Sequence, residues 1–189
     1  MTDELPPIEE RRSTDDDDHD LIDPLGVGIL TVSSSRAAAA DDPENIDDPG
    51  GDEIETILTE AGHVVTVREL VPDDYVRVAT TVSSLVDRED VDLVITTGGT
   101  GVTVDDVSPD AVSGVFDTML PGFGELFRML SYEEVASRAM ASRATAGIAR
   151  GVPIFVLPGS VNAVRLATEE LIVPEAPHLA GLATRHRYE

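Results

Sequence analysis

The chain has 189 residues, and 37 acidic against 13 basic residues give it a formal net charge of −24 at pH 7. No stretch reaches the roughly 18–20 consecutive apolar residues of a membrane span, and the absence of cysteine excludes disulfides and thiolate metal ligands. No basic stripe for nucleic acid is present, so we expect a cytoplasmic protein with neither a membrane nor a nucleic-acid partner.

The surplus of carboxylates has two interpretations, an acidic surface for protein interactions or an adaptation to high salt. We favour the second because every basic residue is an arginine and lysine is absent. At molar salt the Debye length falls to about 3 Å, which largely screens the self-repulsion of such a surface. Compositions of this kind resemble those of extremely halophilic archaea. The charge therefore indicates habitat rather than mechanism.

Residues 1–23 contain a run of four aspartates and no apolar period, which predicts a disordered acidic tail before a single domain over 24–189. The β-branched run Val27–Val32 predicts a strand buried on both faces, as in parallel sheets. Ser33 and Ser34 follow this strand, where ligands bind in parallel α/β sheets. They are candidates for phosphate contact, and an ordinary surface loop is the alternative.

Apolar spacing predicts helices over 52–61 and 75–86 and strands over 64–70 and 91–95. This alternation indicates right-handed crossovers and an α/β fold with a mostly parallel sheet. Asp73 and Asp74 precede the second helix, and either can cap its free amides.

The loop TTGGTG at 96–101 follows the strand at 91–95 and is followed by Asp105 and Asp106. Its glycines allow backbone amides to approach an anion closely, and carboxylates nearby suit a metal ion. Ser108 and Pro109 then predict a helix start with a hydroxyl cap. We therefore expect the active site in this stretch.

The last third of the chain predicts a short apolar helix over 121–130, strands over 142–148 and 153–157, and a second strand–loop–helix turn around Ser160. Residues 135–168 contain no acid but four arginines. This segment predicts either a buried or subunit-contact face or a face for an anionic ligand. The four are Arg138, Arg143, Arg150 and Arg165.

Several separated motifs, in order, resemble the molybdenum-cofactor biosynthesis family that binds molybdopterin, of the MoaB and MogA type. They span Val27 to about Pro177. The motifs are the serines at 33–34, VPDD at 71–74, TTGGTG at 96–101 with Asp106, PGFGELFRMLSYEE at 121–134, SRATAG at 142–147 and LPGS at 157–160.

The resemblance implies a three-layer αβα sandwich whose domain over 24–189 binds molybdopterin. It also implies an enzyme that adenylylates molybdopterin with ATP in the presence of Mg²⁺, releasing pyrophosphate. Asp73 and Asp106 take the catalytic and metal-binding roles by similarity. The substrate contacts implied are Ser33, Ser34, Asp48, Gly51, Thr97, Gly98, Gly99, Thr100, Gly101, Ser131, Pro158, Gly159 and Ser160.

The family further implies a homotrimer or homohexamer and a downstream metal-insertion enzyme as partner. Two alternatives stay open: a non-catalytic paralogue that only binds the pterin, and a nucleotide hydrolase of the same fold. Retention of Asp73 and Asp106 argues against the first. The residue before Asp106 is often basic in the family, so Asp105 is expected to point to solvent.

Overall fold

The computed structural model describes residues 5–15, 19–39 and 47–185. Its main feature is a six-stranded sheet with strand order β4-β3-β5-β8-β7-β6, in which the first four strands are parallel and β7 pairs antiparallel with both β8 and β6. The strands are β3 (Gly26–Val32), β4 (Val64–Val71), β5 (Leu93–Thr97), β6 (Thr118–Met119), β7 (Thr145–Ala149) and β8 (Val152–Leu157).

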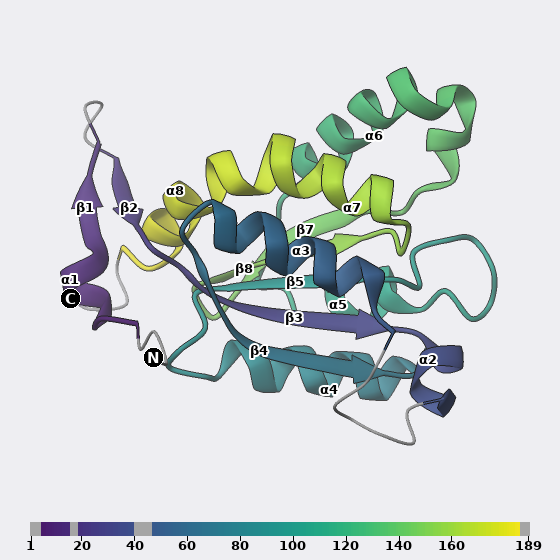
Figure 1. Cartoon of the computed structure of the whole chain (residues 1–189), viewed down its shortest axis with the longest axis horizontal. Helices are drawn as coiled ribbons and strands as arrows, with labels where there is room; N and C mark the ends of the chain where they lie inside the picture. Colours follow the sequence, from purple (N-terminus) through teal and green to yellow (C-terminus); the bar gives the residue numbers. More distant parts are fainter. Residues whose placement is uncertain (1–4, 16–18, 40–46, 186–189) are drawn as a thin grey trace.

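Helices cover both faces of this sheet (Figure 1). Helices α3, α6, α7 and α8 pack on one face, and α4 and α5 pack on the other, which confirms the predicted three-layer αβα sandwich. The helices are α2 (Ser34–Ala39), α3 (Pro49–Glu60), α4 (Tyr75–Val86), α5 (Ser108–Ser113), α6 (Pro121–Val135), the 3₁₀ helix η1 (Ala136–Ala141), α7 (Val161–Ala167), the π-helix η2 (Thr168–Ile172) and α8 (Val173–Ala183).

The central strands are hydrophobic throughout because both of their faces are covered. In β3, Ile29 belongs to the core beneath α3 and α6, whereas its neighbour Leu30 belongs to the core beneath α4 and α5. Side chains of consecutive strand residues point to opposite faces, so both must be apolar here. The sequence pattern therefore identified the most buried part of the sheet correctly.

Several element boundaries differ from the sequence-based expectation. Helix α3 begins three residues early because the Asp48 carboxylate accepts a hydrogen bond from the Gly51 amide and caps it. Strand β7 begins at Thr145 rather than at 142, because Arg143 is hydrogen-bonded to the glycine loop and does not join the strand. Asp74 caps α4 as predicted, but Ser108 forms no side-chain cap on α5.

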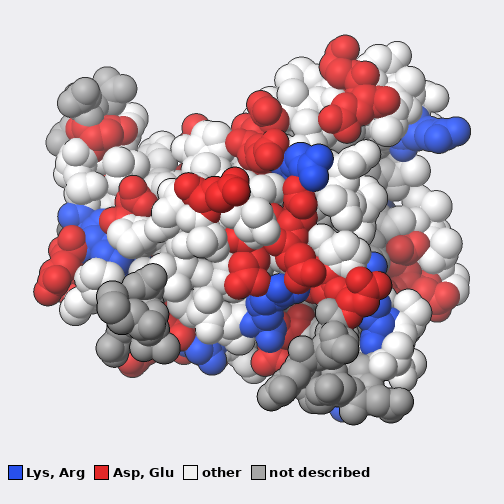
Figure 2. Space-filling view, in the orientation of Figure 1, with Lys and Arg blue, Asp and Glu red and all other residues white. Residues whose placement is uncertain are grey.

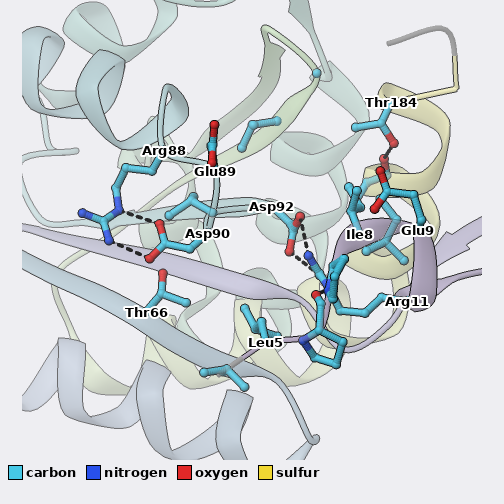
Figure 3. Close-up of a pocket in the computed structure, with 18 of the residues that line it drawn as sticks. Leu5, Ile8, Glu9, Arg11, Thr66, Arg88, Glu89, Asp90, Asp92 and Thr184 are labelled. Carbon is cyan, nitrogen blue, oxygen red and sulfur yellow. Dashed lines mark hydrogen bonds and ion pairs between the residues drawn. The ribbon is translucent and has the colours of Figure 1, made fainter. Parts of the chain in front are cut away.

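The segment before β3 is not a structureless tail in the ranges 5–15 and 19–23. It contains α1 (Ile8–Arg11) and a hairpin of β1 (Arg12–Thr14) and β2 (Asp20–Ile22). Arg11 is buried and donates a 2.6 Å hydrogen bond to Asp92 at the start of β5 (Figure 3). Ile22 is fully buried in the main core. A composition-based expectation missed these two anchors because the aspartate run dominates the segment.

Carboxylates are spread over the molecular surface, and arginines lie among them (Figure 2). Arg68 pairs with Asp48, Asp52 and Glu55, and these hydrogen bonds raise its pKa despite the opposing effect of burial.

Within the described residues, no helix is long and apolar enough to cross a membrane.

Candidate functional site

Asp73 and Ser34 fix each other at the carboxyl ends of β4 and β3. The Ser34 amide donates to Asp73 Oδ2 over 2.7 Å, and the Asp73 amide donates to Ser34 Oγ over 2.9 Å. Asp73 Oδ1 faces Gly99 and, among the residues that the structure describes, has no hydrogen-bond donor. This free oxygen belongs to the carboxylate predicted to be catalytic. Ser33 lies one residue before Ser34, and its Oγ is 3.2 Å from Ser35 Oγ.

The glycine loop lies directly against the end of β3. Gly98 has φ +100° and Gly99 has φ +61°, conformations that side chains disfavour. A Cβ at Gly98 would lie 2.2 Å from the Val32 carbonyl oxygen. Gly98 is therefore required by the close approach of the ends of β3 and β5, and Gly99 is favoured by its positive φ. The loop and the second turn also touch, because a Cβ at Gly159 would lie 3.3 Å from the Gly98 Cα.

Asp106 closes the far side of the glycine loop. Its Oδ2 accepts hydrogen bonds from the Thr103 hydroxyl at 2.6 Å and the Thr103 amide at 2.8 Å. The hydroxyl bond, followed by backbone donors and the Arg143 charge, lowers the pKa of Asp106 despite partial desolvation. The carboxylate is therefore ionised at neutral pH. Asp105 is exposed, as predicted.

Arg143, which lies just before β7, is hydrogen-bonded to the glycine loop and to the residues that follow it. Its Nε donates to the Gly101 carbonyl over 2.7 Å, its Nη1 donates to Asp110 over 2.8 Å, and its Nη2 donates to the Asp106 carbonyl. Its backbone amide donates to the Thr100 carbonyl over 3.2 Å. One planar guanidinium thus spans three acceptors along the loop, a geometry that an ammonium group cannot reproduce.

We expect Arg143→Lys to loosen the glycine loop without unfolding the protein. Lysine keeps the charge but loses at least one loop carbonyl contact, so the backbone amides over 101–107 should exchange about tenfold faster. Hydrogen exchange followed by mass spectrometry measures this rate. Arg150→Lys is the matched control, because Arg150 pairs with Asp87 on another part of the surface. Equal loop exchange in both variants would contradict the role of Arg143.

The remaining residues predicted near a nucleotide have structural roles in this arrangement. Asp48 is buried, and its oxygens accept from the Gly51 amide, the Thr31 hydroxyl and Arg68. Thr97 donates its hydroxyl to the Pro158 carbonyl over 3.0 Å and so ties the glycine loop to the second turn. Direct substrate contact by Asp48, Gly51 and Thr97 stays a prediction.

The second turn borders a cavity of about 970 Å³ between α6, η1 and α7. Ser131, Pro158 and Ser160, all predicted as substrate contacts, line it together with Phe127, which is otherwise buried in the core. Arg138 also lines it; the guanidinium is exposed and, within the described part of the chain, carries no hydrogen bond or ion pair. The lining thus combines hydroxyls and two arginines with the carboxylates of Glu134, Glu169 and Glu170.

A larger cavity of about 1270 Å³ lies at the amino-terminal ends of strands β4, β5 and β8, opposite the strand ends that carry the glycine loop (Figure 3). The segment containing Leu5, Ile8 and Arg11 lines it together with the start of β5. None of the predicted site residues contributes to its lining. Parallel α/β folds bind ligands at the carboxyl ends of strands, so we place the functional site at the glycine loop.

The donor set at the loop suits a magnesium ion that is shared with a substrate. Within the described ranges, no three metal-ligating side chains converge. Mg²⁺ is commonly held by one or two carboxylates, several waters and substrate phosphates, so three converging protein ligands are not required. Asp73 Oδ1 and the Asp106 carboxylate both face the glycine loop and fit this pattern.

Sequence reasoning did not find Thr103, and it named Ser108 only as a helix cap and Arg143 only as one of the four arginines of the acid-free stretch. The absence of acids over 135–168 did draw attention to Arg143. Three of its four arginines pair with acids from outside the stretch: Arg143 with Asp110, Arg150 with Asp87 and Arg165 with Glu53. No pattern in the sequence distinguished Ser108 from an ordinary helix cap.

Comparison with known proteins gives consistent matches over most of the chain. A family model described as "Probable molybdopterin binding domain" matches residues 28–178. Molybdenum cofactor biosynthesis protein B of Bacillus cereus is 44% identical over 152 residues, which cover 80% of this chain and 86% of that protein. A crystal structure of molybdenum cofactor biosynthesis protein B superposes with a TM-score of 0.79 at 43% identity, covering 86% of this chain and 99% of that one. The tungsten cofactor synthesizing protein MoaB of Pyrococcus furiosus superposes with a TM-score of 0.76 at 36% identity, covering 85% and 98%.

Proposed function

The chain belongs to the molybdopterin-binding domain family of molybdenum cofactor biosynthesis, and on that premise we propose that it adenylylates molybdopterin. In this reaction the terminal phosphate of the pterin attacks the α-phosphate of ATP and pyrophosphate leaves. The product is the substrate for a downstream enzyme that inserts molybdenum or tungsten.

The arrangement of Asp73 and Asp106 carries the proposal. The two carboxylates face one glycine loop whose backbone is held open by Gly98 and Gly99. Transfer between phosphates depends mainly on positioning and charge neutralisation rather than on a protein nucleophile. A backbone cradle between two carboxylates supplies the required positions for phosphate and cation.

Each part of the site has a defined task in this scheme. The glycine loop binds phosphate oxygens, and Arg143 keeps that loop in place. Asp73 and Asp106 would hold Mg²⁺, which would neutralise charge on the phosphates. The cavity lined by Phe127 and Ser131 takes the pterin, and Arg138 provides a positive charge for an anionic group of the substrate.

Two other functions remain as alternatives. A paralogue that only binds the pterin would need the cradle and the cavity but not two carboxylates beside the loop. A nucleotide hydrolase would need the carboxylates but no pterin cavity. The combination of both features favours the transferase.

Purified protein in molar salt, given molybdopterin, ATP and Mg²⁺, is expected to release pyrophosphate. Pyrophosphate release without pterin would indicate the hydrolase. Pterin binding without pyrophosphate release would indicate the binding-only function. Omission of Mg²⁺ should abolish turnover.

We also propose a homotrimer or homohexamer. Helix α6 exposes four large apolar side chains, each 46–59% exposed, which is unusual in a chain with this many surface acids. They are Leu126, Met129, Tyr132 and Val135.

The double variant Met129→Glu/Tyr132→Glu is expected to be monomeric, because two buried charges in a subunit contact are unfavourable. Analytical ultracentrifugation in molar salt measures the mass. Val76→Glu, at an exposed valine on the opposite layer, should leave the assembly intact. A monomeric wild type, or an assembly that survives the double substitution, would contradict this contact.

A further inference from the structure

Ser108 carries a hydroxyl with no partner at the centre of the site. The residue is fully buried, and its Oγ forms no hydrogen bond within the described part of the chain. Buried hydroxyls are normally satisfied, because an unpaired one loses its hydration without compensation. The Ser108 amide, in contrast, donates to the Gly99 carbonyl over 3.1 Å. Among the described residues, only the side-chain hydroxyl of Ser108 therefore lacks a partner, whereas its backbone amide has one.

The Ser108 hydroxyl and the Asp73 carboxylate face the same point. A Cβ built on Gly99 would lie 2.6 Å from Ser108 Oγ and 3.1 Å from Asp73 Oδ1. One of these atoms is a donor without an acceptor, and the other is an acceptor without a donor. Only the absence of a side chain at Gly99 keeps the space between them free. The two groups are thus complementary across the glycine loop.

We propose that Ser108 is a positioning residue for Asp73. When ligand binds and the loop shifts at Gly98 and Gly99, the Ser108 hydroxyl donates to Asp73 Oδ1. Ser34 already holds Oδ2 through its amide, so this bond fixes both carboxylate oxygens. A carboxylate oxygen has two lone-pair directions, so Oδ1 retains one for a cation. The inference rests on the proposed function in taking Asp73 as the carboxylate that serves the bound nucleotide.

The proposal makes stability and ligand affinity move in opposite directions. In the free protein, Ser108→Ala removes an unsatisfied group and should leave the Tm unchanged or raise it by about 2–4 °C. In the presence of ligand, the same change removes a hydrogen bond to Asp73 and should weaken MgATP binding about fivefold. A hydroxyl with only a structural role would show no such opposition.

The test measures MgATP affinity by calorimetry and Tm by thermal unfolding, both on the full chain in molar salt. Ser108→Thr keeps the hydroxyl and should bind MgATP within about twofold of the wild type. Thr168→Val is the matched control, since Thr168 is another fully buried residue whose hydroxyl has no partner among the described residues, but it is the first residue of η2. It should keep wild-type affinity. In an Asp73→Asn background, Ser108→Ala should change affinity by less than about twofold, because both substitutions act on one bond.

Three results would overturn the proposal: equal MgATP affinity for wild type and Ser108→Ala, loss of affinity that Ser108→Thr does not restore, or no MgATP binding by the wild type. Should Ser108→Thr fail to fold, Ser108→Cys takes its place, with affinity expected between those of Ser and Ala. These readouts are independent of turnover. A wild type that binds MgATP in a Ser108-dependent manner but releases no pyrophosphate would refute the transferase while supporting Ser108.

Discussion

Asp106→Asn is expected to reduce pyrophosphate release by about 10²–10³-fold, the scale seen when one charge-stabilising group is removed from an active site. The aspartate is held ionised by donors from Thr103, which lower its pKa, so the wild type presents a full negative charge to the loop. Asparagine has nearly the same shape but no charge. The substitution therefore removes the cation-holding function without removing volume.

The fold should survive this change. The asparagine oxygen can still accept the hydrogen bond from the Thr103 hydroxyl, so at most about 1 kcal/mol of stability is at stake. A thermal unfolding curve checks this, and pyrophosphate release under saturating ATP and Mg²⁺ measures the loss of activity. A large fall in Tm would mean that Asp106 serves the loop and not the chemistry.

Asp105→Asn provides the matched control for Asp106→Asn. It removes the same charge from the adjacent residue, but Asp105 is exposed to solvent. We expect activity within about twofold of the wild type, since an exposed charge in molar salt acts only over about 3 Å. If both variants lose activity equally, the loss comes from net charge, and the assignment of Asp106 is wrong.

The fold was predictable because its central strands leave little ambiguity. Val27–Val32 is apolar at every position except one threonine, and only a strand covered on both faces requires that pattern. Helix α4 was located to the residue because its apolar positions repeat with helical spacing and Asp74 caps it. The antiparallel edge formed by β6 and β7 was not predictable, because β6 is a two-residue strand with no periodicity.

The site was predictable where a residue type has one main use. Two glycines between a strand and a helix mark a close backbone approach, and both have positive φ. The role of Ser108 was not predictable, because serine before proline is a common helix cap. Only the three-dimensional packing shows that its hydroxyl points at Gly99 instead. Arg143 likewise acts through contacts with residues more than thirty positions away.

The second large effect is expected at the buried ion pair that joins the N-terminal segment to the sheet. Arg11 and Asp92 have side chains only 4% and 7% exposed, and their closest atoms are 2.6 Å apart (Figure 3). Arg11 also donates to the carbonyls of Pro6 and Pro24, and Asp92 accepts from the Gly26 amide. Removing one charge leaves the other buried without a counter-ion.

Arg11→Met should therefore destabilise the protein by about 3–5 kcal/mol and lower the Tm by roughly 6–20 °C. Thermal unfolding in molar salt measures it, because a buried pair is screened far less than a surface pair. Arg11→Met/Asp92→Asn should recover more than half of the loss, since asparagine is uncharged and its oxygen still accepts from the Gly26 amide.

Arg88→Met is the control, because Arg88 lies at the same end of the sheet as Asp92. Arg88 pairs with Asp90 over 2.6 Å, but both side chains are more than 40% exposed, and such pairs contribute about 0–1 kcal/mol. A Tm loss in Arg11→Met no larger than that in Arg88→Met would mean that residues 5–23 are not anchored. The composition-based expectation of a disordered tail would then be correct. This comparison therefore distinguishes a disordered acidic segment from one that the Arg11–Asp92 ion pair anchors to the sheet.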